Sequence, residues 1–385
     1  MYYRRCSWEG NKKIMRKKIM IVRNGPYPVD INAYNDQFIG LARAFAKVGY
    51  DSDIFYYSKK DENTIDISVD NAAIRVYNTR GIRVLRTGIY PKLLSKKFQN
   101  KYDLIITTEY SQIMTFLFSF SHIPVILYTG PYYNLFKLPF LSPIYDLLFT
   151  KRIDKKMKKI LTKSELTTEF LTKKGYHNIT TVGVGQDVDR FSENVVISKK
   201  AKKLSTFMEN NNCILTVGSI DSRKNFPFIL DVMEKLIKKD NSYTLICIGT
   251  GDEKFISREL LKHSEQLRER IIFPGKFDNR ELKNIYPKAK IFIHPAKLEI
   301  FGMVLLEAMY FGTIVLSSPN GGSTTLIKNG ENGYVLDIDN VDNWVKKIVE
   351  IDNNRELKSK IISNAKKTIE SDYTWDNIVK YFLNK

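Results

Sequence analysis

Residues 291–322 read IFIHPAKLEIFGMVLLEAMYFGTIVLSSPNGG. Two short apolar runs, 291–293 and 313–316, are typical of buried strands, and the apolar segment 303–311 between them predicts a helix. A strand, a helix and a further strand in this order predict a unit of a parallel sheet. Because ligands of such sheets bind at the carboxyl ends of the strands, a site is expected in the loops that follow them.

The same alternation extends along the rest of the chain. Further strands are expected at 19–22, 53–57, 103–107, 124–128, 159–163, 179–182, 212–217, 243–248 and 271–273, and further helices at 35–48, 228–238 and 253–267. The pattern predicts an α/β fold of two doubly wound, Rossmann-like domains, and the cleft between two such domains is the expected site.

Two segments bear on the limits of these domains. The polar stretch SENVVISKKAKK, residues 192–203, is the expected link between an N-terminal domain, 15–190, and a C-terminal domain, 191–365. Met15 begins a second plausible start, MRKKIMIV, so residues 1–14 are expected to be an N-terminal extension or to precede the native start.

Composition narrows the class of partner. The chain has 385 residues, of which 43% are hydrophobic and 27% charged, and these values exclude disorder, collagen and coiled coil as its main character. Its net charge of +19 suggests a polyanionic partner: nucleic acid, an anionic membrane or a phosphorylated substrate. The charge is uneven, because residues 1–190 hold 31 basic and 17 acidic side chains and the remainder holds 30 and 25.

Cysteines and hydropathy indicate the compartment. Cys6, Cys213 and Cys247 have neither the number of a disulfide framework nor the spacing of a zinc site, which favours a reducing cytoplasm and buried thiols at the last two. No run of 18 apolar residues predicts a membrane span, and the basic start lacks the apolar region of a signal peptide.

Candidate chemistry lies after two predicted strands of the C-terminal half. Gly218 ends the strand 212–217, and Arg223 and Lys224 lie on the next loop, where two adjacent cations suit a diphosphate. The alternative is a pair of solvated surface cations. Gly249 and Gly251 follow the strand 243–248, but glycines are common in loops and do not by themselves indicate a binding site.

The second set surrounds the helix 303–311. Glu299 precedes the helix and Gly302 lies at its start, where free N–H groups and the helix dipole favour a phosphate. Glu307 lies inside an otherwise apolar helix, and a buried carboxylate there needs hydrogen-bond partners such as ribose hydroxyls. The alternative places Glu307 on an exposed edge.

These motifs, in this order, resemble the retaining glycosyltransferases of family 4, also described as group 1, which have the two-domain GT-B fold. The resemblance rests on VGSIDSRKN, IGTGDEK, GVGQDVDRF and the long segment 271–337, and the two glutamates eight apart match the family's E-x7-E motif. It covers residues 159–345 well and the N-terminal half loosely. The closing segment YTWDNIVKYFLNK resembles the family's last helix, which implies a helix at 366–385 that returns to the N-terminal domain, anchored by Trp375.

The resemblance implies a role for each matching residue. Arg223 and Lys224 would neutralise the diphosphate of a nucleotide-sugar donor, with a UDP-sugar favoured. Glu299 would contact the donor sugar near the reacting carbon, and Glu307 would bind the ribose. Backbone N–H groups at Phe301, Gly302, Met303 and Val304 would hold phosphate and sugar, and Gly218 and Gly25 are counted among the donor-binding positions. Stabilising the charge of the leaving diphosphate is the largest catalytic effect expected, and these groups supply it without a metal or cofactor.

The N-terminal half departs from the family. Many members have Gly-Gly in the first strand–helix loop, where this chain has Ile31-Asn32-Ala33, and many have a His where Thr129-Gly130-Pro131 stands. His294 is expected to be structural. The Asp-x-Asp strings at 51–53, 187–189 and 337–339 are not interpreted as metal sites.

Two neighbouring segments bear on the acceptor. Residues 132–149, YYNLFKLPFLSPIYDLLF, are apolar and aromatic, and residues 151–174 hold nine basic and three acidic side chains. Together they are typical of a protein that binds the surface of an anionic membrane, although a core helix pair with a solvated basic face would give the same pattern. No nucleic-acid-binding motif is present, which makes nucleic acid the least favoured partner.

We therefore expect a cytoplasmic retaining glycosyltransferase, a hexosyl- or N-acetylhexosaminyltransferase, peripheral on the inner face of the cell membrane. It would transfer a sugar to a lipid-linked saccharide in the assembly of a bacterial surface polysaccharide, either a capsule or a cell-wall glycan. A glycosidase using Glu299 and Glu307, a nucleotide-sugar epimerase and an inactive membrane-docked partner subunit remain as alternatives.

Overall fold

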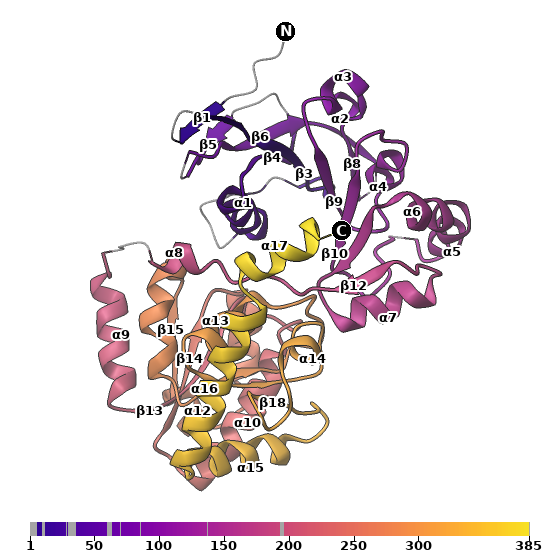
Figure 1. Ribbon diagram of the computed structural model, residues 1–385. Coiled ribbons are helices and arrows are strands. Elements are labelled where there is room, and N and C mark those ends of the chain that lie inside the picture. Colours follow the sequence, from indigo (N-terminus) through magenta and orange to yellow (C-terminus); the bar gives the residue numbers. More distant parts are fainter. Residues whose placement is uncertain are drawn as a thin grey trace. The chain divides into compact units, whose positions relative to one another are not determined.

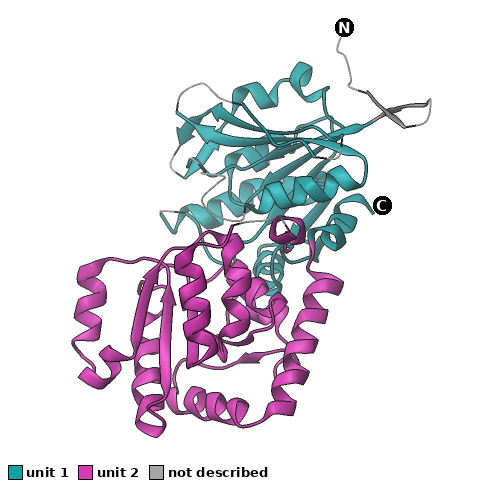
Figure 2. Ribbon diagram, turned by 90° about the vertical axis from the view of Figure 1, so that its left-hand side faces the viewer, with its two compact units in different colours: residues 1–185, 375–385 teal, residues 186–374 magenta. Residues whose placement is uncertain are grey.

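The computed structural model describes residues 6–9, 12–27, 29, 36–59, 64–69, 71–84, 86–136, 138–192 and 196–384. The chain divides into two compact units, shown in Figure 2. Unit 1 comprises residues 1–185 and 375–385, and unit 2 comprises residues 186–374.

Unit 1 is built on an eight-stranded sheet in the order β12-β11-β10-β9-β3-β4-β6-β5 (Figure 1). Its strands are β3 (Lys17–Val22), β4 (Tyr50–Ser58), β5 (Thr64–Asp66), β6 (Ile74–Arg80), β9 (Leu104–Thr108), β10 (Val125–Thr129), β11 (Lys159–Thr162) and β12 (Ile179–Thr181). β5 is antiparallel to β6, and the other neighbours are parallel. The first of these strands, β3, lies inside the sheet, so the strand order reverses between β3 and β9.

Smaller elements and helices complete unit 1. Two short hairpins pair β1 (Cys6–Glu9) with β2 (Lys12–Met15) and β7 (Ile82–Val84) with β8 (Thr87–Ile89). The helical segments are α1 (Gln37–Lys47), α2 (Pro91–Leu94), α3 (Lys96–Gln99), α4 (Ile113–Phe118), α5 (Leu141–Tyr145), η1 (Asp146–Thr150), α6 (Lys151–Lys156), α7 (Glu165–Lys173) and α17 (Trp375–Leu383). Asp36 caps α1 by accepting hydrogen bonds from the N–H groups of Phe38 and Ile39. α17 packs on α1, where the rings of Phe45 and Phe382 meet edge to face at 5.8 Å.

Unit 2 has a six-stranded parallel sheet in the order β15-β14-β13-β16-β17-β18. Its strands are β13 (Asn212–Val217), β14 (Tyr243–Ile248), β15 (Ile271–Gly275), β16 (Ile291–His294), β17 (Ile314–Ser317) and β18 (Tyr334–Val335). The chain adds β14 and β15 on one side of β13 and then returns to add β16, β17 and β18 on the other. This is the doubly wound Rossmann order, and its switch point lies between β13 and β16.

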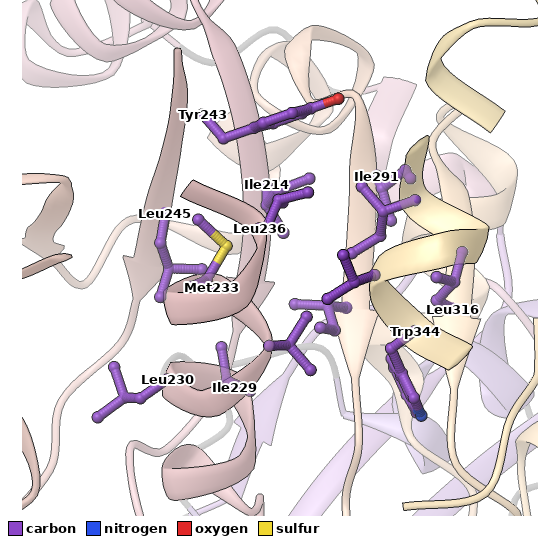
Figure 3. Packing of buried hydrophobic residues seen from close by; sticks show 14 of the residues in the cluster. Ile214, Ile229, Leu230, Met233, Leu236, Tyr243, Leu245, Ile291, Leu316 and Trp344 are labelled. Carbon is purple, nitrogen blue, oxygen red and sulfur yellow. The ribbon is translucent and has the colours of Figure 1, made fainter. Parts of the chain in front are cut away.

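Helices surround this sheet (Figure 1). They are α8 (Val188–Ser192), α9 (Lys199–Glu209), α10 (Phe226–Lys239), α11 (Glu253–Leu260), α12 (Glu265–Glu269), η2 (Asn279–Asn284), η3 (Tyr286–Lys288), α13 (Met303–Tyr310), α14 (Ser323–Leu326), α15 (Val341–Asp352) and α16 (Arg355–Asp372). Figure 3 shows how the apolar face of α10, with Ile229, Met233 and Leu236, packs toward strand residues such as Ile214. The buried ring of Trp344, on α15, meets Phe228 edge to face at 5.4 Å. Burial of these large apolar side chains is the main stabilising contribution to the unit.

The structure corrects two details of the expected organisation. The chain passes from unit 1 to unit 2 after Gly185, and Lys199 to Lys203 form the start of helix α9 rather than a link. Its four lysines lie on the solvated face of this amphipathic helix, which buries Leu204 and Met208. At the other end, residues 366–374 belong to unit 2, because α16 continues to Asp372 with Ala365 and Ile369 buried. Only α17 belongs to unit 1, and its first residue, Trp375, is buried.

Both unit-2 cysteines are buried thiols, as the sequence predicts. Burial raises the pKa of the Cys213 thiol to about 11 and also raises the pKa of Cys247, so neither is a reactive thiolate. Cys6 lies in β1.

Candidate active site

The loop after β13 is shaped by close approaches of backbone to backbone. Gly218 has φ +135°, a conformation that L side chains rarely adopt. A Cβ on Gly249 would lie 1.8 Å from the carbonyl oxygen of Gly218, so the loop after β14 packs directly against the loop after β13. The glycines of these two motifs thus hold the segment 218–225 in place at the carboxyl end of the sheet.

The two cations of that segment meet the loop after β16. The Lys224 ammonium forms an ion pair with Glu299 Oε2, and Arg223 Nη1 lies 3.4 Å from the same oxygen. The Lys224 side chain is mostly buried, whereas the Arg223 side chain is 47% exposed. The loop after β13 and the loop after β16 therefore converge at the switch point of the unit 2 sheet.

Burial and charge compete at this pair. Burial lowers the pKa of Lys224, and the Glu299 carboxylate opposes that effect. Asp221 supports the loop from behind, because its Oδ1 accepts a hydrogen bond of 2.8 Å from the backbone N–H of Lys224. Burial raises the pKa of Asp221, but hydrogen bonds from Ser219 and Lys224 outweigh this and lower it. Asp221 therefore stays ionised, and its hydrogen bond fixes the loop that carries Arg223 and Lys224.

The Glu299 loop rests on the two glycines that follow β17. A Cβ on Gly321 would lie 2.0 Å from the carbonyl oxygen of Ile300, and one on Gly322 would lie 1.5 Å from that of Phe301. The N–H of Gly321 also donates to the carbonyl of Glu299 at 3.1 Å. Only residues without a side chain allow this contact, so the Pro-Asn-Gly-Gly motif positions Glu299 and the start of α13.

The start of α13 has the geometry expected of an anion site. Gly302 precedes the helix with φ +78°, and Met303 and Val304 in the first turn are partly exposed. The first N–H groups of a helix have no partner within the helix and carry the positive end of its dipole. Phe301, by contrast, is buried, so its side chain anchors the loop and only its backbone can serve a ligand.

Glu307 is buried inside α13 and not on an exposed edge. Its side chain is 2% exposed, Oε1 accepts a hydrogen bond of 2.9 Å from Asn279 Nδ2, and Oε2 accepts one of 2.9 Å from the Tyr286 hydroxyl. Burial raises the pKa of Glu307 to about 7, although both hydrogen bonds lower it. The carboxylate already has protein partners on both oxygens, and its remaining lone pairs are the ones a ribose could use.

His294 ends β16 beside Glu299. Its ring is buried, and Nε2, which has no hydrogen-bond partner among the residues that the structure describes, lies 4.0 Å from Glu299 Oε2. Burial lowers the pKa of His294 well below its usual value, and the charges of Lys224 and Arg223 lower it further. The imidazole is therefore neutral and adds no charge to the site.

The structure gathers most of the residues predicted from the sequence at one place in unit 2. Gly218, Arg223, Lys224, Glu299 and Gly302 lie in the loops that meet at the switch point. Glu307 lies further along α13, among η2 and η3. Gly25 follows β3 in unit 1, and Ile31, Asn32 and Ala33 lie outside the described residues.

Two partners of Glu307, Asn279 and Tyr286, have no role in the sequence interpretation. Both lie in the segment FDNRELKNIY, whose clearest local signal is the capping box of Asp278 and Glu281 at the start of η2. That signal marks a helix start and not a ligand of a carboxylate. Asn279 and Tyr286 could be found only once Glu307 was known to be buried and to need donors.

The Asp-x-Asp string that lies in β4 is occupied by ion pairs. Asp51 Oδ1 lies 3.3 Å from Arg16 Nε, and Asp53 Oδ2 lies 2.5 Å from Lys18 Nζ. Within the described part of the chain, no three His, Cys, Asp or Glu side chains form a group that could hold a metal ion.

Comparison with known proteins shows what the segment holding this site is similar to. Residues 198–368, all in unit 2, match the family model described as glycosyl transferases group 1. Over 176 residues the chain is 30% identical to an uncharacterized glycosyltransferase of Methanocaldococcus jannaschii, a match that covers 46% of this chain and 45% of that protein. The resemblance to the glycosyl transferases of group 1 is confirmed.

A second group 1-like relative is 28% identical over 160 residues, covering 41% of this chain and 43% of that protein. It is the GalNAc-alpha-(1->4)-GalNAc-alpha-(1->3)-diNAcBac-PP-undecaprenol alpha-1,4-N-acetyl-D-galactosaminyltransferase of Campylobacter jejuni. The chain spans about half the length of the curated relatives it matches.

Solved structures extend the likeness to both units. The crystal structure of Anabaena HepE in complex with UDP has a TM-score of 0.71 and 14% identity, and the match covers 95% of this chain and 98% of that one. At this identity the likeness establishes the fold alone. It confirms the predicted class, an α/β GT-B fold with two Rossmann-like units, for unit 1 as well as for the group 1 glycosyl transferase segment of unit 2.

Proposed function

We propose that this protein is a retaining glycosyltransferase that moves a sugar from a nucleotide diphosphate donor to a saccharide acceptor. The observation that carries the proposal is the convergence of Lys224, Arg223 and Glu299 at the switch point of unit 2, beside the free N-terminus of α13. The two cations and the helix dipole suit the diphosphate that leaves, and the carboxylate suits the sugar that is transferred.

The chemistry follows from the charges. As the glycosidic bond to the diphosphate breaks, negative charge grows on the leaving oxygen, and preorganised positive groups that stabilise it lower the barrier most. Lys224 and Arg223 are held by Asp221 and by the glycine contacts, so little reorganisation is needed. Glu299 would exchange its ion pair with Lys224 for hydrogen bonds to hydroxyls of the donor sugar.

The favoured donor is a UDP-sugar, with no resident cofactor and no metal required. Support comes from the fold-related Anabaena HepE, whose crystal structures contain UDP and UDP-glucose. Glu307 would accept a hydrogen bond from a ribose hydroxyl through a lone pair that Asn279 and Tyr286 leave unused.

The acceptor is proposed to be a lipid-linked saccharide, used in assembling a bacterial surface polysaccharide such as a capsule or cell-wall glycan. The Campylobacter jejuni relative bears the name of an enzyme that acts on a saccharide joined through a diphosphate to undecaprenol. Such an acceptor requires the enzyme to work at a membrane surface, on its cytoplasmic face.

Unit 1 has a surface suited to that task. We call the exposed apolar side chains of the segment 138–148 the apolar patch; they are Leu138, Phe140, Ile144, Leu147 and Leu148. Leu147 is 84% exposed, which favours a surface role for this segment over a core helix pair with only a basic face outside. The exposed cations Lys151, Lys155 and Lys156 follow on α6, and this combination suits the surface of an anionic membrane.

No described helix has the length and apolar character that crossing a bilayer would require. We propose a peripheral attachment through the segment 132–174, with the apolar patch inserted between headgroups and the lysines over anionic lipid.

A thermal-shift screen of nucleotide sugars tests the proposal. A true donor should raise the melting temperature in proportion to its affinity, because it binds the folded state only. Incubating the donor identified in this way with and without a saccharide acceptor then separates transfer from hydrolysis. Rapid hydrolysis that an acceptor neither slows nor diverts into product would identify a glycosidase and contradict the proposal.

A further inference from the structure

Lys163 is a buried lysine that none of the chemistry above uses. It is the first residue after β11, at the carboxyl end of the unit 1 sheet, and its backbone N–H donates to the carbonyl of Thr129 at 2.9 Å. The residue is 7% exposed, and its ammonium nitrogen lies 4.9 Å from the ring centre of Tyr128 and 5.8 Å from that of Phe38. Among the described residues, these two ring contacts are the interactions of this nitrogen, and no hydrogen bond or ion pair joins it to an acceptor.

The nearest acidic side chains are held by other donors. Asp36 Oδ1 accepts hydrogen bonds from the N–H groups of Phe38 and Ile39 and one of 2.6 Å from the Tyr56 hydroxyl. Glu109 Oε2 accepts one of 3.1 Å from Thr129 Oγ1 and one of 3.4 Å from the N–H of Gly130. Both carboxylates act on Lys163 only through space.

A second cation lies at the same edge of the sheet. Arg23 directly follows β3, and its partly exposed guanidinium has no hydrogen bond or ion pair within the described part of the chain. Burial lowers the pKa of Lys163, Glu109 raises it, Arg23 lowers it further and Asp36 raises it, so three neighbouring charges act on Lys163.

Such an arrangement is costly unless a ligand completes it. Contact with two aromatic rings offsets only part of the free energy lost when an ammonium leaves water, and a buried cation without a counter-ion destabilises the fold. The carboxyl edge of a doubly wound sheet is where ligands bind, and Arg23 and Glu109 beside Lys163 are partly exposed there.

We propose that Lys163, assisted by Arg23, binds a phosphate group of the acceptor substrate. A phosphate offers each cation an anionic acceptor in direct contact, whereas a sugar hydroxyl accepts hydrogen bonds but brings no charge. The inference rests on the proposed function for the role of unit 1 on the acceptor side. The same chemistry can come from a soluble sugar phosphate or from the diphosphate of a lipid-linked saccharide.

The first test is a calorimetric titration of the full chain with inorganic pyrophosphate, with UDP at saturation so that the cations of unit 2 are occupied. Lys163→Met removes the ammonium and keeps an apolar side chain of similar length. Lys97→Met, at an exposed lysine on α3, is the matched control for net charge. We expect pyrophosphate affinity to fall about 10- to 100-fold in Lys163→Met and to stay unchanged in Lys97→Met, because charge-assisted hydrogen bonds have this strength.

Stability gives a second readout that separates binding from folding. Lys163→Met should melt at the wild-type temperature or above it, because the variant no longer buries an unpaired charge. Should it fail to fold, Arg23→Met, at a partly exposed position, replaces it in the same titration with the same expected loss.

Two acceptor-like ligands then distinguish the source of the phosphate: glucose 6-phosphate in solution, and a polyprenyl diphosphate in phosphatidylcholine vesicles. If either ligand binds the wild type more tightly than Lys163→Met, the proposal is supported, and that ligand identifies the source of the phosphate. Equal pyrophosphate binding by Lys163→Met and Lys97→Met would overturn it. UDP binding is measured separately, so a failure of the proposed donor site would show as loss of UDP binding in the wild type, whatever the effect of Lys163.

Discussion

Lys224 and Glu299 form an ion pair across the switch point of the unit 2 sheet, one from the loop after β13 and the other from the loop after β16. Arg223 approaches the same carboxylate oxygen at 3.4 Å. Without a donor, Glu299 therefore occupies the cations that we assign to the diphosphate. Binding of the donor requires Lys224 to exchange one anionic partner for another, which leaves Glu299 facing the sugar.

This exchange predicts that Glu299→Gln separates binding from transfer. The neutral amide no longer competes for Lys224, so UDP should bind at least as tightly as in the wild type, and up to about tenfold more tightly if one ion pair no longer has to be broken. The transfer rate should fall by about 100-fold or more, because a group near the reacting sugar is altered. Calorimetry with UDP and initial-rate measurements check both; weaker UDP binding in Glu299→Gln would contradict the exchange.

The buried carboxyl of Glu307 predicts a pH dependence of stability. Its pKa is raised to about 7 in the folded protein from an ordinary value near 4.5, so the folded state binds the proton more tightly than the unfolded state does. The group thus contributes stability that is fully present below pH 4.5 and is lost as the pH rises through 7. This contribution to the free energy of unfolding is about 3 kcal/mol at most, since each unit of pKa corresponds to 1.36 kcal/mol.

Denaturant unfolding at a series of pH values measures this effect. Glu307→Gln should flatten the decline in the free energy of unfolding between pH 4.5 and 7, because the amide does not titrate. Glu253→Gln, at an exposed carboxylate in the first turn of α11, is the control and should leave the decline intact. An unchanged slope in Glu307→Gln would assign the pH dependence to other groups.

The contact of Gly322 with Phe301 predicts that a single methyl group disrupts the site. Gly322→Ala would place a Cβ 1.5 Å from a backbone oxygen, and the Glu299 loop would have to move. We expect a loss of about 1–3 kcal/mol in the free energy of unfolding, together with weaker UDP binding. Gly25→Ala is the comparison, since its Cβ would meet only a side-chain atom of Tyr27 at 3.8 Å; it should leave stability within about 0.5 kcal/mol.

The apolar patch predicts membrane binding that depends on exposed leucines. Leu147→Glu should abolish flotation with vesicles that contain anionic lipid, because it places a charge where an apolar side chain would be inserted. Leu261→Glu makes the same substitution at a position in unit 2 that is 73% exposed, and it should float like the wild type. High salt should weaken but not remove wild-type binding, as screening acts on the lysines alone. Equal flotation of the two variants would show that the patch does not bind membranes.

Periodicity and motif order predicted most of unit 2 from the sequence. Strand 212–217 and strand 243–248 match β13 and β14 residue for residue, because unbroken apolar runs between turn residues are typical of buried parallel strands. The resemblance to the family, and not periodicity, implied a joint role for Arg223, Lys224 and Glu299, whose loops follow neighbouring strands in the structure. The same reasoning missed β6, β7 and β8, whose sequences mix polar with apolar residues, and it took the start of α9 for part of a link.

What the sequence could not supply is the environment of each side chain. Nothing near Glu307 in the sequence identifies Asn279 and Tyr286 as its partners, since these contacts depend on tertiary packing. Lys163 likewise lies within a basic run and resembles a surface lysine until its burial is known. Counter-ions and burial are properties of the fold, so the residues that they single out emerge only from the structure.

The central claim is that Lys224 binds the diphosphate of a nucleotide donor, and calorimetric titration with UDP tests it most directly. The wild type and Lys254→Ala, which removes an exposed lysine on α11, should bind UDP with equal affinity. Lys224→Ala should remain folded and bind UDP at least about 30-fold more weakly, since it loses a buried charge-assisted contact. Equal affinity of a folded Lys224→Ala protein and the wild type would contradict the account.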